Sequence, residues 1–99
     1  MAVGVQIDVV GGTLEQYDEV IERMGFLPGG PAAPNELFHW VTPTENGFRV
    51  IDVWESKEAF DSFIEEKVIP LFDEVGVPDT REITYFHVHN YLAGGRGRR

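Results

Sequence analysis

The chain has 99 residues, no cysteine and a formal net charge of -9, from 17 acidic residues against 8 lysines and arginines. This length fits one domain with a small core, and the absence of cysteine excludes a disulfide scaffold, a thiolate zinc site and a cysteine nucleophile. The negative charge disfavours nucleic-acid binding, and no apolar run approaches the roughly 20 residues that cross a bilayer, so we expect a cytoplasmic protein that engages neither nucleic acid nor membrane.

The beginning of the chain predicts a strand followed by a helix. Apolar residues alternate with glycine and polar residues over 3–10, which is the period of a half-buried strand. Thr13 and Gln16 form a capping-box signature, and apolar residues then recur at helical spacing until Gly25, which predicts the end of the helix. The region 26–35 holds three prolines and two glycines and is expected to be a loop.

A hairpin is predicted next. Aromatic and β-branched residues cluster over 36–42 and again over 48–54. The connector 43–47 begins with proline and ends in Asn-Gly, a dipeptide typical of hairpin turns. We therefore expect these two strands to pair with each other.

The last part of the chain predicts a second helix and a final strand. Ser56 is placed to cap the helix. Pro70 has no N–H to donate and clashes with the preceding turn, so we expect a kink or a break near 67–69, with 71–75 as a separate turn. The region 82–92 is expected to form one long strand.

This element order predicts an α+β fold of the ferredoxin-like βαββαβ type, a single domain over 1–93. Four antiparallel strands would carry both helices on one face. The last strand also offers large side chains to the other face, among them Phe86 and Val88, so we expect a second copy of the chain to cover that face in a homodimer. Residues 94–99 hold three arginines among glycines and are expected to be a disordered basic tail.

The turn from the third strand into the second helix carries the string Trp54-Glu55-Ser56-Lys57-Glu58-Ala59-Phe60. It resembles the W-x-S-x-E-A-F string of the dimeric α+β barrel superfamily, in particular its antibiotic biosynthesis monooxygenase-like branch. A likeness to small actinobacterial proteins lies in Phe38-His39, Pro43-Thr44 and Val88-His89-Asn90. The resemblance implies that Trp54 lines a pocket between sheet and helices, where cofactor-free monooxygenases oxidise aromatic polyketides and some relatives degrade haem. Other members of the superfamily catalyse isomerisation or cyclisation.

The sequence departs from the haem-degrading relatives at two places. Those relatives carry a proximal histidine in the second helix, and the corresponding segment here has none. They also use an asparagine on the first strand, where the nearest candidates here are Gln6 and Asp8. The resemblance therefore implies an amide role in substrate binding for Gln6 only.

His39, Asp52 and Trp54 form the first candidate constellation. Asp52 and Trp54 are two residues apart on one strand and so share a face, and His39 lies on the partner strand of the hairpin. An aspartate on an apolar face beside a histidine is typical of a base and the group that orients it, so His39 and Asp52 are the catalytic candidates. A structural hydrogen bond that pins the hairpin, or an Asp52 that faces water, would explain the same spacing.

His87 and His89 form the second candidate set, on one face of the last strand and flanked by tyrosines. Two imidazoles at this spacing could share a metal ion if His39 or Asp52 supplied a third ligand. Packing at a subunit interface suits an aromatic strand better, so we assign no metal.

Tyr17 belongs to the apolar stripe of the first helix, where it either packs in the core or points into the pocket and orients a phenolic substrate. The chain holds 12% aromatic residues, which makes an aromatic-lined cavity easy to build. Such a cavity suits planar aromatic ligands better than sugars or phosphates.

Together with these residues, the resemblance implies a homodimeric barrel that acts on a hydrophobic aromatic molecule without a cofactor, as a monooxygenase or as a cyclase or isomerase. His39 would remove a proton, Asp52 would orient it, and Trp54 and Tyr17 would hold the ring. Oxygen chemistry without metal or flavin needs a substrate anion, so the proton must leave first. The alternatives are a non-catalytic dimeric ligand-binding or assembly module, and a barrel that binds metal or haem through its last strand.

Overall fold

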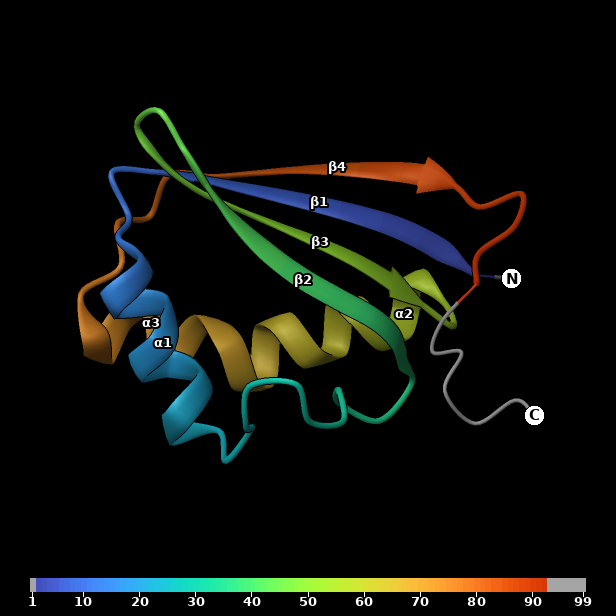
Figure 1. Ribbon diagram of the computed structural model, residues 1–99, viewed down its shortest axis with the longest axis horizontal. Helices are drawn as coiled ribbons and strands as arrows, with labels where there is room; N and C mark the ends of the chain where they lie inside the picture. Colours follow the sequence, from blue (N-terminus) through green and yellow to red (C-terminus); the bar gives the residue numbers. More distant parts are fainter. Residues whose placement is uncertain (1, 93–99) are drawn as a thin grey trace.

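The structure, a computed structural model, describes residues 2–92 and has two layers, an antiparallel sheet and a set of helices packed against one of its faces (Figure 1). The predicted ferredoxin-like βαββαβ arrangement is confirmed, with one continuous helical run in the second helical position. The predicted basic tail over 94–99 lies outside the described residues. The elements are β1 (Val3–Val10), α1 (Leu14–Arg23), β2 (Glu36–Thr44), β3 (Gly47–Trp54), α2 (Lys57–Phe63), the π-helical η1 (Ile64–Val68), α3 (Ile69–Val75) and β4 (Arg81–His87).

The strands lie in the order β2-β3-β1-β4, and every neighbouring pair is antiparallel. Every second side chain of β3 is buried, because one face of the strand meets the helices. β2 is an edge strand, where Pro43 is tolerated although it cannot donate to a neighbouring strand. An edge strand and its neighbour therefore border the space between the sheet and the helices.

The core lies between the sheet and the helices. Its most deeply buried large side chains are Val5, Val9, Val20, Phe48, Trp54 and Phe60. The predicted capping box fixes the start of α1: the Gln16 N–H donates to Thr13 Oγ1 at 3.1 Å, and the Thr13 N–H donates to Gln16 Oε1 at 3.0 Å. Gln16 Nε2 also donates to the Gly76 carbonyl oxygen at 3.1 Å, which ties α1 to the end of α3.

The hairpin between β2 and β3 is tighter than its five-residue connector indicated. β2 runs to Thr44 and β3 starts at Gly47, so only two residues form the turn. A Cβ atom at Gly47 would lie 1.9 Å from the Val9 carbonyl oxygen, so only glycine fits there.

The helical run continues through Pro70, so the separate turn expected at 71–75 is wrong. The irregularity predicted near 67–69 takes the form of the π-helical segment η1, at whose end the Ile69 N–H donates to the Ile64 carbonyl five residues back. Pro70 then occupies the first turn of α3, where a missing N–H costs little. A wider turn ahead of the proline is a known way to make room for its ring.

The last strand is shorter than predicted. β4 ends at His87, whereas the sequence indicated a strand as far as Leu92. His87 pairs with Val3, the first residue of β1, so the pairing of β4 stops where β1 begins.

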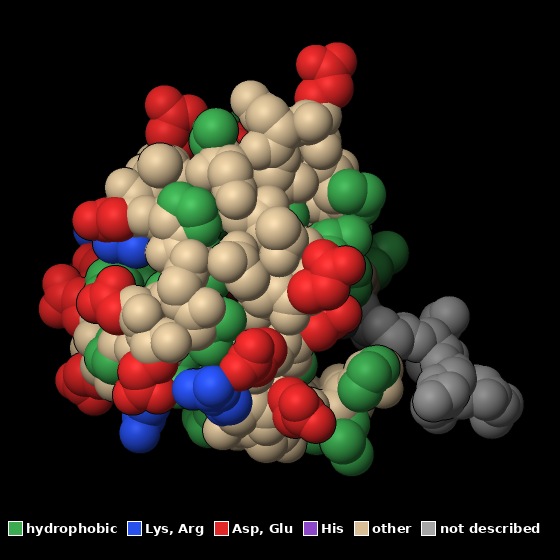
Figure 2. Space-filling view, turned by 90° about the vertical axis from the view of Figure 1, so that its left-hand side faces the viewer, with side chains coloured by type: hydrophobic (Ala, Val, Ile, Leu, Met, Phe, Trp, Pro, Cys, Tyr) green, Lys and Arg blue, Asp and Glu red, His purple; other side chains and the backbone are tan. Residues whose placement is uncertain are grey.

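The face of the sheet that points away from the helices carries large exposed side chains. Phe38 and Trp40 of β2 and Phe86 of β4 are 41%, 47% and 50% exposed. Acidic side chains instead spread over the end of the molecule where α1 and α3 lie (Figure 2).

Within residues 2–92, no helix is long and apolar enough to span a membrane.

Candidate active site

Four of the residues singled out in the sequence form one chain of hydrogen bonds. His39 of β2 lies directly opposite Asp52 of β3, and its Nδ1 is 2.7 Å from Asp52 Oδ1. Trp54 Nε1 donates to the other oxygen of Asp52, Oδ2, at 3.0 Å. At the far side of the imidazole, Nε2 forms a short hydrogen bond with the hydroxyl of Tyr17 from α1. The sheet and α1 thus hold one histidine from both sides.

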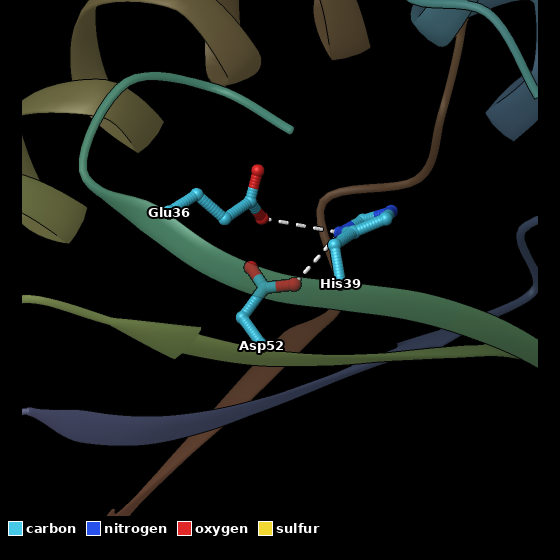
Figure 3. A group of neighbouring side chains, drawn as sticks. All are labelled: Glu36, His39 and Asp52. Atoms are coloured by element: carbon cyan, nitrogen blue, oxygen red, sulfur yellow. Dashed lines mark hydrogen bonds and ion pairs between the residues drawn. The ribbon is translucent and has the colours of Figure 1, made fainter. Parts of the chain in front are cut away.

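Glu36 is a fifth member of this group, and it was missed in the sequence. Its Oε2 lies 3.2 Å from His39 Nδ1, and its Oε1 accepts a hydrogen bond from the Ala33 N–H at 3.0 Å. Glu36 and Asp52 therefore converge on one ring nitrogen (Figure 3).

A β-bulge explains why Glu36 escaped notice. Residues three apart on a regular strand point to opposite faces, which would send Glu36 and His39 to different sides of the sheet. The pairing of β2 with β3 is irregular between Glu36 and Phe38, because Leu37 is an extra residue on β2. This bulge brings Glu36 opposite Trp54, on the helix side. A bulge leaves no reliable mark in the period of a short strand.

The two carboxyl groups set the protonation of His39. Burial by itself lowers the pKa of the imidazole, but the hydrogen bonds with Asp52 and Glu36 and the charge of Asp52 outweigh burial and raise the pKa to about 11. At neutral pH the ring is therefore an imidazolium, which donates from both nitrogens. The Tyr17 oxygen must then accept from Nε2, and the Tyr17 hydroxyl hydrogen is free to point elsewhere.

The pKa of the Glu36 carboxyl group is also raised, but for a different reason. Burial is the main cause that raises the pKa of its carboxyl group, and the negative charge of Asp52 adds to it, against the opposing hydrogen bond from His39. The side chain of Glu36 is only 7% exposed. The site thus holds two buried carboxyl groups, which differ in their hydrogen-bond partners: Glu36 accepts from the Ala33 N–H, and Asp52 accepts from Trp54.

These polar groups face an apolar cavity of about 690 Å³ between the sheet, the helices and the loop after α1. Tyr17, Glu36, His39 and Asp52 form its polar wall. Aromatic side chains from the loop and from the second helical run form much of the rest: Phe26, Phe60, Phe63 and Phe72. The size and lining suit a planar hydrophobic molecule with one or two oxygen atoms.

Trp54 and Gln6 do not lie in the wall of this cavity. Trp54 is 1% exposed and packs against Phe60 and Phe63, with ring centroids 5.8 and 5.2 Å away. It therefore anchors Asp52 from behind. Gln6 points to the opposite face of the sheet, where its amide donates to Asp8 Oδ2 at 3.2 Å. The structure does not bring Gln6 together with the other site residues.

One group of side chains within residues 2–92 offers donor atoms close enough to share a cation. It consists of Glu36, His39 and Asp52, whose donor atoms all lie within 4.8 Å of one another. A proton on His39 Nδ1 fills the place between the two carboxylates that a cation would take. His87 and His89 are not part of this group, and the argument from a shared strand face is wrong because β4 ends at His87.

No protein-family model matches the sequence, and no curated protein matches it. Among solved structures, the chain is similar to SnoaB, a cofactor-independent oxygenase from Streptomyces nogalater, with a TM-score of 0.58, 19% identity and coverage of 94% of this chain and 97% of that chain. A dimeric ferredoxin-like protein from Thermobifida fusca gives a TM-score of 0.61 at 14% identity, over 89% and 92% of the two chains.

A third similar structure is a Deinococcus radiodurans protein described as a candidate antibiotic biosynthesis monooxygenase. It gives a TM-score of 0.57 at 12% identity, over 96% of this chain and 99% of that chain. At these identities the likeness establishes the fold alone. The expected ferredoxin-like fold is therefore confirmed, and the Deinococcus radiodurans protein described as a candidate antibiotic biosynthesis monooxygenase shares it.

Proposed function

We propose that the protein is a cofactor-independent oxygenase that works as a homodimer on a hydrophobic aromatic molecule, from which it first removes a proton. The observation that supports this most is the chain from Trp54 through Asp52 and His39 to Tyr17, because it ends at the wall of an aromatic-lined cavity. The similarity in fold to SnoaB, which is a cofactor-independent oxygenase, agrees with the proposal.

In this proposal His39 acts as a hydrogen-bond donor. The role of base that its spacing from Asp52 indicated needs a neutral imidazole, whereas the raised pKa favours the imidazolium at neutral pH. The imidazolium donates to the Tyr17 oxygen, and Tyr17 donates to the oxygen of the substrate. A positive charge transmitted through one hydroxyl stabilises an enolate or phenolate, which is the species that must form before oxygen can react.

The reaction that fits this site converts a CH₂ group between two aromatic rings into a ketone. Loss of one proton gives a delocalised anion, the anion gives electrons to O₂, and a peroxide forms at that carbon. Loss of water from the peroxide leaves the ketone, so that R₂CH₂ and O₂ yield R₂C=O and H₂O. Oxygen is the only co-reactant.

The exposed face of the sheet supports the homodimer. Phe38, Trp40 and Phe86 lie on it, and a second copy of the chain buries such a face without new chemistry. The Thermobifida fusca protein of the same fold is dimeric. Two sheets packed face to face would leave both cavities on the outer sides of the dimer.

The test uses 1,8-dihydroxyanthrone, whose CH₂ group lies between two rings, in buffer that contains a metal chelator. The expected result is formation of the anthraquinone with one O₂ consumed per product, faster than the reaction in buffer alone. If the protein binds this probe without accelerating oxygen uptake, the protein is a ligand-binding module and the oxygenase proposal is wrong.

A further inference from the structure

The side-chain cluster at the cavity contains one more carboxylate than the imidazole needs. His39 Nδ1 carries a single proton, and Asp52 is the nearer acceptor, at 2.7 Å against 3.2 Å for Glu36. Both oxygens of Asp52 are engaged, Oδ1 by His39 and Oδ2 by Trp54. Asp52 alone is therefore enough to accept the hydrogen bond from the imidazolium, and Glu36 is not needed for that purpose.

Glu36 is held firmly at the cavity wall. The Ala33 N–H fixes its Oε1, and Ala33 is itself buried. Its Oε2 keeps a free lone pair beside the 3.2 Å contact with His39. Asp52 lies against the sheet, whereas Glu36 lies farther from it, on the side of the helices (Figure 3). Both carboxylates line the cavity, and of the two it is Glu36 that keeps an oxygen, Oε2, available to a molecule there.

We propose that Glu36 is the catalytic residue that accepts the proton from the substrate. This inference rests on the proposed function. The C–H bond of the substrate breaks, the proton goes to Glu36 Oε2, and the electron pair stays on the substrate, where Tyr17 and the His39 imidazolium hold the resulting oxyanion. Charge is conserved within the cavity, and no oxidant takes part in this step.

The surroundings of the two carboxyl groups suit them to different roles. Poor hydration and the neighbouring Asp52 make Glu36 a stronger base than an exposed glutamate, as their effect on its pKa shows. Tyr17, His39 and Asp52 are the other titratable groups of the polar wall, and each already has a role: Tyr17 and His39 donate hydrogen bonds, and Asp52 holds His39. Asp18 is a third carboxylate that lines the cavity, but it is exposed on α1.

The test separates proton removal from oxygen chemistry by excluding oxygen. Under anaerobic conditions in D₂O, proton NMR follows the exchange of the CH₂ hydrogens of 1,8-dihydroxyanthrone for deuterium. Binding of the product, 1,8-dihydroxyanthraquinone, is measured in parallel as a control for the integrity of the cavity. We expect the wild-type protein to accelerate exchange over buffer.

Glu36→Gln is expected to slow exchange by about 100-fold while product affinity stays within a few-fold of wild type. Glu22→Gln is the matched control, because Glu22 is an exposed residue of α1 outside the cavity lining, and it is expected to exchange at the wild-type rate. Equal exchange in Glu36→Gln and wild type would overturn the assignment, and so would loss of exchange in Glu22→Gln. If Glu36→Gln does not fold, Glu36→Asp decides, because it keeps the charge but withdraws the carboxylate: unchanged exchange in that variant overturns the assignment.

The outcome distinguishes this inference from the proposed function. If the wild-type protein accelerates exchange but not oxygen uptake, the oxygenase proposal is refuted. The variants of Glu36 then still decide whether Glu36 accepts the proton. Oxygen uptake with exchange that Glu36→Gln does not alter would leave the oxygenase intact and refute the role of Glu36. A wild-type protein that neither binds nor exchanges the probe refutes both.

Discussion

The rings of Tyr17 and His39 lie nearly parallel, with 10° between the ring planes and 6.0 Å between their centroids, and the Tyr17 hydroxyl forms a hydrogen bond with His39 Nε2. This arrangement joins α1 to the edge strand β2 at the wall of the cavity. It also fixes the direction of the hydrogen bond, since a protonated His39 can only donate. The hydroxyl hydrogen of Tyr17 is thereby available to a ligand.

Tyr17→Phe is expected to lower kcat about 100-fold, because it removes one donor to the developing anion. The phenyl ring keeps the packing against Phe48, whose ring centroid is 5.7 Å away, so KM and the melting temperature should change little. Oxygen uptake with 1,8-dihydroxyanthrone measures the effect. A variant as active as wild type would remove Tyr17 from the chemistry.

Asp52→Asn is expected to lower the free energy of unfolding by about 3–5 kcal/mol, because it breaks a buried ion pair from one side. Asp52 is 4% exposed and bonded to both His39 and Trp54. The matched control is Asp8→Asn, which breaks the more exposed pair with Arg49 and should cost about 0–1 kcal/mol. Urea unfolding compares the two variants. Equal losses would show that the Asp52 network stabilises the fold no more than an exposed ion pair does.

Much of the candidate site could be predicted from the period of two along the strands. His39 and Asp52 were placed together because residues facing each other in a hairpin share a side of the sheet, and the register confirms that pairing. The position of Glu36 could not be predicted, because it depends on a bulge. The burial of Trp54 behind the cavity depends on its packing against α2, which its place on the strand does not reveal.

The boundaries of the elements followed the same logic. Capping and glycine signals located α1 and its end, where Gly25 has a positive φ of 85°. The ends of β4 depend instead on where its partner β1 begins, which no local pattern of residues 82–92 records. Local chemistry could therefore be predicted, whereas features set by a distant partner could not.

The stability of the protein is expected to fall as pH rises above neutrality. Folding raises the pKa of His39 from 6.5 to about 11, so the folded state binds this proton more tightly. Its stabilising contribution is complete below about pH 6.5 and is lost as pH rises towards the folded pKa. The raised pKa of Glu36 acts in the same direction at lower pH. Urea unfolding at pH 6.5, 8 and 9.5 should show a steeper loss for wild type than for His39→Gln, and parallel curves would contradict the ion-pair description.

Association through the exposed sheet face predicts that a charge there will dissociate the protein. Trp40→Glu places a carboxylate on the face that also carries Phe38 and Phe86, and it is expected to yield monomers in sedimentation equilibrium. Leu27→Glu is the control, since this 74% exposed residue lies in the loop after α1, away from that face. A wild-type protein that sediments as a monomer would refute the dimer, and a Trp40→Glu dimer would place the interface elsewhere.

The most direct test of the account is the protonation state of His39 in the folded protein. A two-bond ¹H–¹⁵N NMR spectrum at pH 8.5, assigned by comparison with His39→Gln, reports whether each ring nitrogen carries a proton. We predict that both Nδ1 and Nε2 of His39 are protonated at this pH, as an imidazolium between Tyr17 and two carboxyl groups requires. A neutral ring at pH 8.5 would contradict the donor role of His39 and return it to the role of a base.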